Sequence, residues 1–263
     1  MESTVTHQIH ALPAEVQPEH PAMEWTVGIV GLGSFGRFMA SVLQDKVQVM
    51  GYDPGPSLPE LPQLERVELE AAASADVAIL AVPLDTLGSA LQGIRQVLHP
   101  DTLVVDVCSV KTRPEQLVAQ HLPDHQNVLL THPLFGPQSA ADGTEGHKLV
   151  VTKSVGDRAV KAIDFCRDSL GLEIREMSAA AHALTLFVAR GLADMGLDDR
   201  AHPDITPPSF EEILDVMELD GQHSDEVFRT IQLGNPHAHE VRRQLLDSLT
   251  HVDEELTAQT GSV

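Results

Sequence analysis

The chain has 263 residues, enough for one large domain or two smaller ones, and 42% of them are hydrophobic, which excludes wholesale disorder. Its 39 Asp and Glu outnumber its 17 Lys and Arg, and it has no apolar run of membrane-spanning length, so we expect no nucleic-acid partner and no membrane partner. Two cysteines are too few for a disulfide scaffold or a four-thiolate zinc site, and we expect a cytoplasmic protein without a metal centre.

The first 24 residues carry four Glu and no Lys or Arg, and we interpret residues 1–24 as a disordered acidic tail. From residue 25 onward, short apolar runs alternate with amphipathic segments of helical length. The predicted strands are residues 26–31, 47–53, 77–83, 103–107, 128–131 and 149–152. The predicted helices between them are residues 35–43, 87–98, 114–121 and 158–170.

The pattern changes after a further predicted strand at residues 172–177, because no other strand-like run follows it. The remaining segments have helical periodicity and are residues 179–195, 210–219, 226–233 and 239–256. We therefore predict a dinucleotide-binding domain over residues 25–178 and a helical domain over residues 179–263.

The predicted strands are apolar along their whole length, which is expected when helices cover both faces of a sheet. Strands that alternate with helices indicate a mostly parallel sheet with right-handed crossovers. The predicted fold class is therefore α/β, a Rossmann-type, doubly wound, mostly parallel sheet followed by a smaller all-helical domain.

A glycine-rich turn, G-L-G-S-F-G, joins the first predicted strand to the first predicted helix. The first glycine permits the tight turn, the second lets a pyrophosphate approach the backbone, and the third lets helix and strand pack closely. An acidic residue ends the second strand about 20 residues later, where it can accept from ribose hydroxyls and repel a 2′-phosphate, which favours NAD over NADP. The expected cofactor-binding residues are Gly31, Gly33, Ser34, Phe35, Gly36 and Asp53, with Val82 and Pro83 at the end of the third predicted strand.

Three more segments fall at the carboxyl ends of later predicted strands, where open α/β sheets bind ligands. They are A-V-P-L at residues 81–84, D-V-C-S-V-K at 106–111 and T-H-P-L-F-G-P at 131–137. Together they bring a hydroxyl (Ser109), an ammonium (Lys111) and an imidazole (His132) to one edge of the sheet. We predict that these three residues are catalytic.

The four motifs together resemble the prephenate/arogenate dehydrogenase family of tyrosine biosynthesis. The resemblance runs from about residue 27 to residue 177 and continues weakly beyond. It implies that NAD⁺ takes a hydride from prephenate or arogenate, a small cyclohexadienol, while CO₂ leaves and the ring becomes aromatic. It also implies that His132 draws off the proton of the ring hydroxyl and that Ser109 orients both groups. Lys111 matches the motif's lysine, which we assign to electrostatic support of substrate or cofactor.

The chain departs from the family pattern in its helical part. About two helical turns are missing between Ser178 and the A-L-T-L-F stretch that begins at Ala183. The family's substrate-binding arginine has no counterpart near residues 217–220, and possible substitutes are Arg190, Arg229, Arg242 and Arg243. A catalytically weakened dinucleotide-binding or regulatory member of the fold is therefore one alternative. A β-hydroxyacid-type dehydrogenase is another, although residues 179–195 lack the lysine that it would need.

Apolar stripes on two of the predicted helices suggest self-association. A helical unit of about 85 residues would be only marginally stable by itself, and a second copy would cover apolar surface that otherwise faces water. We expect a homodimer formed through the helical domain. The stripes are Leu184, Phe187, Val188, Gly191 and Leu192, and Leu245, Leu246, Leu249 and Val252.

Overall fold

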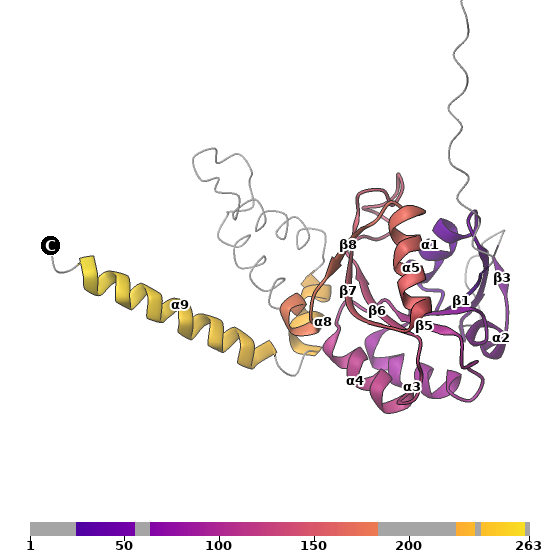
Figure 1. Cartoon of the computed structure of the whole chain (residues 1–263), viewed down its shortest axis with the longest axis horizontal. Coiled ribbons are helices and arrows are strands. Elements are labelled where there is room, and N and C mark those ends of the chain that lie inside the picture. The colour runs from indigo at the N-terminus through magenta and orange to yellow at the C-terminus, as the bar shows by residue number, and fades with distance from the viewer. Residues whose placement is uncertain (1–24, 56–63, 184–224, 235–237, 261–263) are drawn as a thin grey trace, which may run out of the picture.

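A computed structural model describes residues 25–55, 64–183, 225–234 and 238–260 of the chain (Figure 1). Its strands are β1 (Thr26–Val30), β2 (Gln48–Tyr52), β3 (Glu65–Arg66), β4 (Val77–Leu80), β5 (Leu103–Asp106), β6 (Val128–Pro133), β7 (Lys148–Val155) and β8 (Glu173–Glu176). Its helices are α1 (Ser34–Leu43), α2 (Leu69–Ala73), α3 (Leu84–Ile94), α4 (Thr112–His121), α5 (Asp157–Asp168), α8 (Asp225–Gly234) and α9 (Ala238–Thr260).

In the described part of the chain, the strands form one eight-stranded sheet in the order β3-β2-β1-β4-β5-β6-β7-β8. The first six strands in that order are parallel, β7 runs antiparallel to β6, and β8 is parallel to β7. The order reverses between β1 and β4, which is the topological switch point at which such sheets bind dinucleotides. The predicted Rossmann-type, mostly parallel sheet is therefore confirmed.

Helices cover both faces of this sheet, which explains why its central strands are apolar throughout. Helices α1 and α5 pack with one face in a single hydrophobic cluster. Helices α2, α3 and α4 pack on the other face in a second cluster. Strands β4 and β5 are consequently buried along their whole length.

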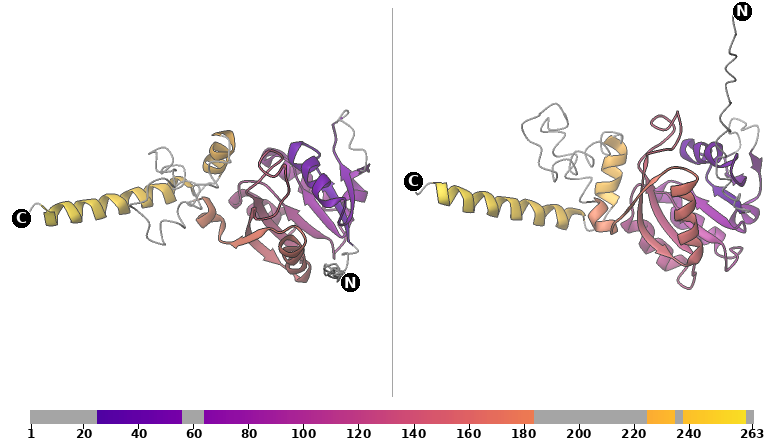
Figure 2. Two further views of the ribbon diagram at one scale, coloured as in Figure 1. Left: turned by 90° about the horizontal axis from the view of Figure 1, so that it is seen from above. Right: turned by 45° about the horizontal axis from the view of Figure 1, so that its top comes forward.

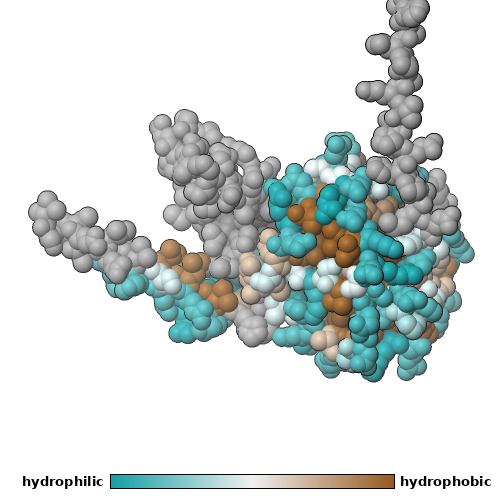
Figure 3. Space-filling view, viewed as in Figure 1, coloured by the Kyte–Doolittle hydropathy of each residue, from teal (hydrophilic) through white to brown (hydrophobic). Residues whose placement is uncertain are grey.

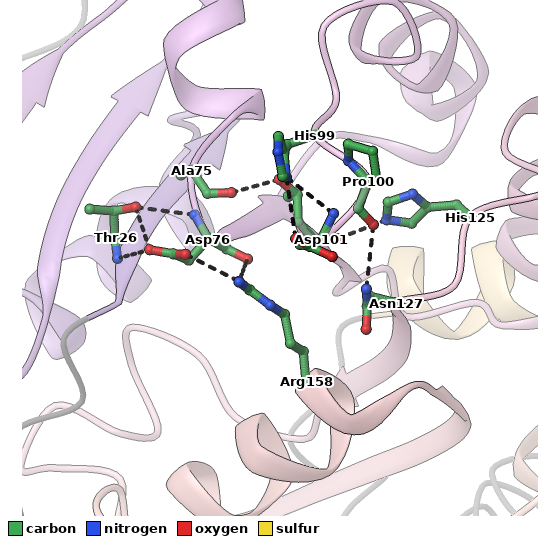
Figure 4. Close-up of polar contacts among 10 residues, drawn as sticks. Thr26, Ala75, Asp76, His99, Pro100, Asp101, His125, Asn127 and Arg158 are labelled. Carbon is green, nitrogen blue, oxygen red and sulfur yellow. Dashed lines mark hydrogen bonds and ion pairs between the residues drawn. The ribbon is translucent and has the colours of Figure 1, made fainter.

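Polar side chains tie the elements together at the amino ends of the strands (Figure 4). The Asp76 carboxylate accepts hydrogen bonds from the Thr26 backbone N–H and hydroxyl, both at 3.0 Å, and Arg158 Nη1 lies 3.1 Å away. The backbone N–H of Thr26, followed by its hydroxyl and Arg158, holds the pKa of Asp76 below its ordinary value. Further along the same edge, His125 Nε2 lies 2.7 Å from the Thr102 carbonyl oxygen.

Several predicted bounds change because strand pairing depends on distant residues. β6 extends beyond the predicted residue 131 because its antiparallel pairing with β7 continues to Pro133. The predicted helix 87–98 begins earlier, at Leu84, and ends at Ile94. β3 and α2 were not predicted from the sequence.

The described helical residues lie beyond β8, and α9 projects away from the sheet (Figures 1 and 2). A helical turn at residues 179–183 begins this part, and α8 and α9 follow. The predicted helix 210–219, most of the predicted helix 179–195 and the predicted tail 1–24 lie outside the described residues. Of the predicted stripe residues, Leu246 and Leu249 on α9 are 55% and 57% exposed, and hydrophobic residues of this helix are visible in Figure 3.

Candidate active site

A cleft of about 770 Å³ opens at the carboxyl ends of the central strands. Its volume lies in the range of small-molecule and cofactor sites. Each lining segment lies at or just after the carboxyl end of a strand, except for one residue of α8, Thr230. Seven of the predicted site residues meet in this lining: Gly33, Ser34, Phe35, Val82, Pro83, Ser109 and His132.

The glycine turn between β1 and α1 has the geometry of a phosphate-binding loop. Gly31 has a φ of +99°, which an L side chain rarely adopts. A Cβ on Gly36 would lie 1.9 Å from the Gly31 carbonyl oxygen, so this position requires glycine. Gly33, in contrast, has no atom within 4 Å of where its Cβ would be, and it leaves open space at the helix N-terminus.

The first turn of α1 carries no acidic residue, so no side chain within that turn opposes the positive potential of its backbone N–H groups. This arrangement suits a diphosphate. Gly31 and Gly36 themselves shape the turn and are not among the residues that line the cleft.

Asp53 joins the glycine turn to the chain that follows β2. One carboxylate oxygen accepts from the Leu32 backbone N–H at 2.8 Å, and the other accepts from the Gly55 N–H at 2.8 Å. The side chain is half-buried beside the turn, outside the cleft lining. A ribose at the turn would meet a carboxylate that the backbone already holds in place.

The loop after β5 brings Ser109 to the cleft. Asp106, the last residue of β5, accepts a hydrogen bond at 3.1 Å from the Cys108 backbone N–H, and this bond shapes the loop. Burial raises the pKa of the Cys108 thiol, which therefore stays protonated and is a poor nucleophile. Ser109, the next residue of this loop, lines the cleft.

Lys111 is placed differently from Ser109. Its side chain is fully buried, and Nζ donates to the Asp106 carboxylate and to the Thr131 carbonyl oxygen. It does not line the cleft. The ammonium therefore connects the end of β5 to the end of β6, immediately before His132.

His132 lies near the end of β6, where the pairing with β7 shifts between Leu130 and Thr131. Such irregularities redirect the side chains next to them. His132 is 3% exposed, lines the cleft, and has its Nδ1 2.9 Å from Nε2 of His182. The sequence analysis did not select His182 or Thr230. The one local signal for His182 is an isolated polar residue in an alanine-rich stretch that follows Ser178.

The described residues that line the cleft include no Lys, Arg, Asp or Glu. Of the four arginines suggested by the sequence, Arg190 lies outside the described residues. Arg242 donates to Gln232 Oε1 at 2.8 Å, and Arg243 pairs with Glu240 at 2.9 Å. Arg229 is exposed on α8, next to Thr230 in sequence.

Comparison with known proteins identifies the family. The family model described as prephenate dehydrogenase, nucleotide-binding domain, matches residues 43–168. Arogenate dehydrogenase 2, chloroplastic, from Arabidopsis thaliana is 31% identical over 196 residues, which are 69% of this chain and 54% of that protein. The chain belongs to the prephenate/arogenate dehydrogenase family.

A second relative is 4-amino-4-deoxyprephenate dehydrogenase from Streptomyces pristinaespiralis, 30% identical over 187 residues. The match covers 66% of this chain and 62% of that protein, so the chain spans only about half to three-fifths of the length of these two relatives.

Among the helices that the structure describes, none combines the length and the apolar character that a membrane span requires.

Solved structures show the same fold. Prephenate dehydrogenase from A. aeolicus, in complex with hydroxyphenyl propionate and NAD⁺, superimposes with a TM-score of 0.61 at 21% identity and covers 92% of this chain and 93% of that one. Synechocystis arogenate dehydrogenase gives a TM-score of 0.59 at 20% identity and covers 88% and 93% of the two chains.

Proposed function

We propose that this protein catalyses the NAD-dependent oxidative decarboxylation of prephenate or arogenate, which yields 4-hydroxyphenylpyruvate or tyrosine in tyrosine biosynthesis. The observation that carries the proposal is the meeting of Ser109 and His132 in one cleft that begins at the glycine turn. The family membership supports it.

The cofactor side of the proposal rests on the turn between β1 and α1. Gly31, Gly33 and Gly36 form the phosphate-binding turn, and Ser34 and Phe35 begin the helix whose free N–H groups would hold the diphosphate. Val82 and Pro83, which line the same cleft after β4, would contact the cofactor beyond the glycine turn. When bound, the cofactor supplies the hydride acceptor.

Asp53 favours NAD over NADP, because its carboxylate would accept from a ribose hydroxyl and repel a 2′-phosphate. Replacement by Ser should narrow the preference for NAD⁺ over NADP⁺ in kcat/KM. A wild type that uses both cofactors equally would contradict this role for Asp53.

His132 acts in this proposal as the base that takes the proton of the ring hydroxyl. As the hydride leaves the carbon that bears this hydroxyl, the O–H proton passes to the imidazole and the ring carboxylate leaves as CO₂. The electrons of the broken carbon–carboxylate bond complete the aromatic ring as a phenolate, and its oxygen takes the proton back from the imidazole to give the phenol of the product. Ser109 holds the hydroxyl in line with His132, and such a base contributes about 10²–10⁴ in rate.

Lys111 supports the site from beneath in this proposal. Its ammonium neutralises the buried Asp106 carboxylate and holds the Thr131 carbonyl, so it positions the backbone that carries both Ser109 and His132. It therefore acts as a positioning residue. Its charge supports the substrate site indirectly, by holding in place the backbone on which Ser109 and His132 lie.

We also propose that residues 179–263 form the helical domain and that two copies of the chain pair through it. On α9, Leu246 and Leu249 expose apolar surface on a helix that projects from the rest of the described chain (Figures 1 and 3). A second copy would bury it. Light scattering should give twice the chain mass of 28.5 kDa, and replacing both leucines by Asp should give the monomer. A monomeric wild type at micromolar concentration would contradict the dimer.

The decisive test follows NADH absorbance with prephenate, arogenate and 4-amino-4-deoxyprephenate, each with NAD⁺ and NADP⁺. We expect turnover with prephenate or arogenate and NAD⁺. The His132→Asn variant should lose at least about tenfold in kcat with almost unchanged NAD⁺ binding, and Ser109→Ala should show a smaller loss in the same direction. NAD⁺ binding without turnover of any of these substrates would favour a regulatory member of the fold.

A further inference from the structure

A second histidine contacts the proposed catalytic base inside the protein. Nδ1 of His132 and Nε2 of His182 are 2.9 Å apart, and the two rings meet edge to face with centroids 5.0 Å apart and planes 68° apart. Both residues are buried, at 3% and 2% exposure. They are 50 residues apart in sequence, His132 on β6 and His182 in the helical turn at residues 179–183.

A bond between two imidazoles needs one donor and one acceptor, so it couples the protonation of the two rings. If His132 Nδ1–H donates to His182 Nε2, then Nε2 of His132 keeps a lone pair and can accept a proton from a ligand in the cleft. If His182 donates instead, the neutral His132 carries its proton on Nε2 and cannot act as a base there. The direction of this one bond therefore decides whether His132 is competent.

We propose that His182 is a positioning residue that accepts the Nδ1–H of His132 and thereby holds His132 in the tautomer whose Nε2 bears the basic lone pair. The inference rests on the function proposed for His132. His182 takes the role that a carboxylate has in a Ser-His-Asp triad, where loss of the correct tautomer lowers kcat severely.

Hydrogen bonds hold the turn that carries His182. The Ser178 hydroxyl accepts from the Ala181 backbone N–H at 3.1 Å, and the Ser178 carbonyl accepts from the His182 N–H at 2.9 Å. This is an N-terminal cap on a helix, and it fixes the direction in which residue 182 projects.

The helical part of the chain also holds this turn from the other side. Gln232 of α8 is 7% exposed, and its Nε2 donates to the Ala183 carbonyl at 3.2 Å. Arg242 of α9 in turn donates to Gln232 Oε1 at 2.8 Å. A chain of contacts thus runs from α9 through α8 to the residue next to His182, so the helical part contributes to the orientation of His132.

The test compares two substitutions of His182. In His182→Gln, the amide oxygen can occupy the place of Nε2 and still accept the bond, whereas His182→Leu removes the acceptor. We expect the Leu variant to lose at least about tenfold in kcat with little change in KM for NAD⁺, and the Gln variant to recover most of that loss. His125→Gln is the matched control, because it alters a bonded histidine at the opposite end of the strands.

Nitrogen-15 NMR of the histidine rings shows which ring nitrogen carries the proton, and it requires no substrate turnover. The wild type and His182→Gln should show His132 protonated at Nδ1 and unprotonated at Nε2, with the resonances assigned by their loss in His132→Asn. In His182→Leu the Nε2–H form should increase. A wild-type His132 protonated at Nε2, or a tautomer unchanged in the Leu variant, would overturn the proposal. This result stands whether or not prephenate and arogenate are substrates, so it separates a failure here from a failure of the proposed function.

Discussion

The ion pair between Lys111 and Asp106 predicts a large loss of stability when only one partner is removed. Both side chains are fully buried, and the ammonium also holds the Thr131 carbonyl. The Lys111→Met substitution keeps the side-chain length but leaves a buried carboxylate without its counter-charge, which typically costs about 3–5 kcal/mol. This is a large part of the roughly 5–15 kcal/mol that stabilises a typical domain, and it corresponds to a fall in Tm of roughly 6–20 °C.

The assay is urea unfolding followed by circular dichroism, with a double variant and a control. In Asp106→Asn/Lys111→Met, the amide oxygen can still accept from the Cys108 N–H while the charge is gone, so this variant should regain at least about 1 kcal/mol over Lys111→Met. Lys153→Met is the matched control, because its pair with Glu115 is 36% and 43% exposed and should contribute less than about 1 kcal/mol. A free energy of unfolding for Lys111→Met within about 1 kcal/mol of the wild-type value would refute the claim that the buried Asp106 carboxylate needs its counter-charge.

Three further predictions follow from the described contacts. Gly36→Ala should lower the Tm markedly, since its Cβ has no room, whereas Gly33→Ala should fold normally but bind NADH more weakly in a fluorescence titration. Because the folded-state pKa of Asp76 lies below its ordinary value, its carboxylate stabilises the fold above about pH 4, and this contribution is lost as the pH falls through the folded-state pKa. The stability gap between wild type and Asp76→Asn should therefore close in acid; a constant gap from pH 7 to pH 2 would contradict it. Arg229 is exposed next to the cleft residue Thr230 and is a candidate to bind a substrate carboxylate, so Arg229→Ala should raise KM for the substrate. Arg243→Ala, which breaks an exposed pair with Glu240, should leave this KM unchanged.

The parallel sheet and the glycine turn could be predicted because their signals are local. Apolar runs of strand length mark strands that helices cover on both faces, and the Gly31 and Gly36 positions require glycine for steric reasons within one turn. β3 and α2 could not be predicted, because such short elements give no local signal. β3 has only two residues, both exposed, and α2 has only five residues in total, so neither is long enough to show a period. Neighbouring strands and helices decide their structure.

The contacts of the site residues could not be predicted, because they join segments far apart in the chain. The sequence by itself determined that Ser109 and Lys111 follow the carboxyl end of one strand and that His132 lies at the carboxyl end of another, since apolar runs of strand length and their alternation with helices are local signals. Only the tertiary structure decided that the Lys111 ammonium lies inside the protein between β5 and β6, and that His132 meets His182 from a helix 50 residues away. A side chain's burial and partners depend on the packing of the whole fold, and no local pattern carries that information.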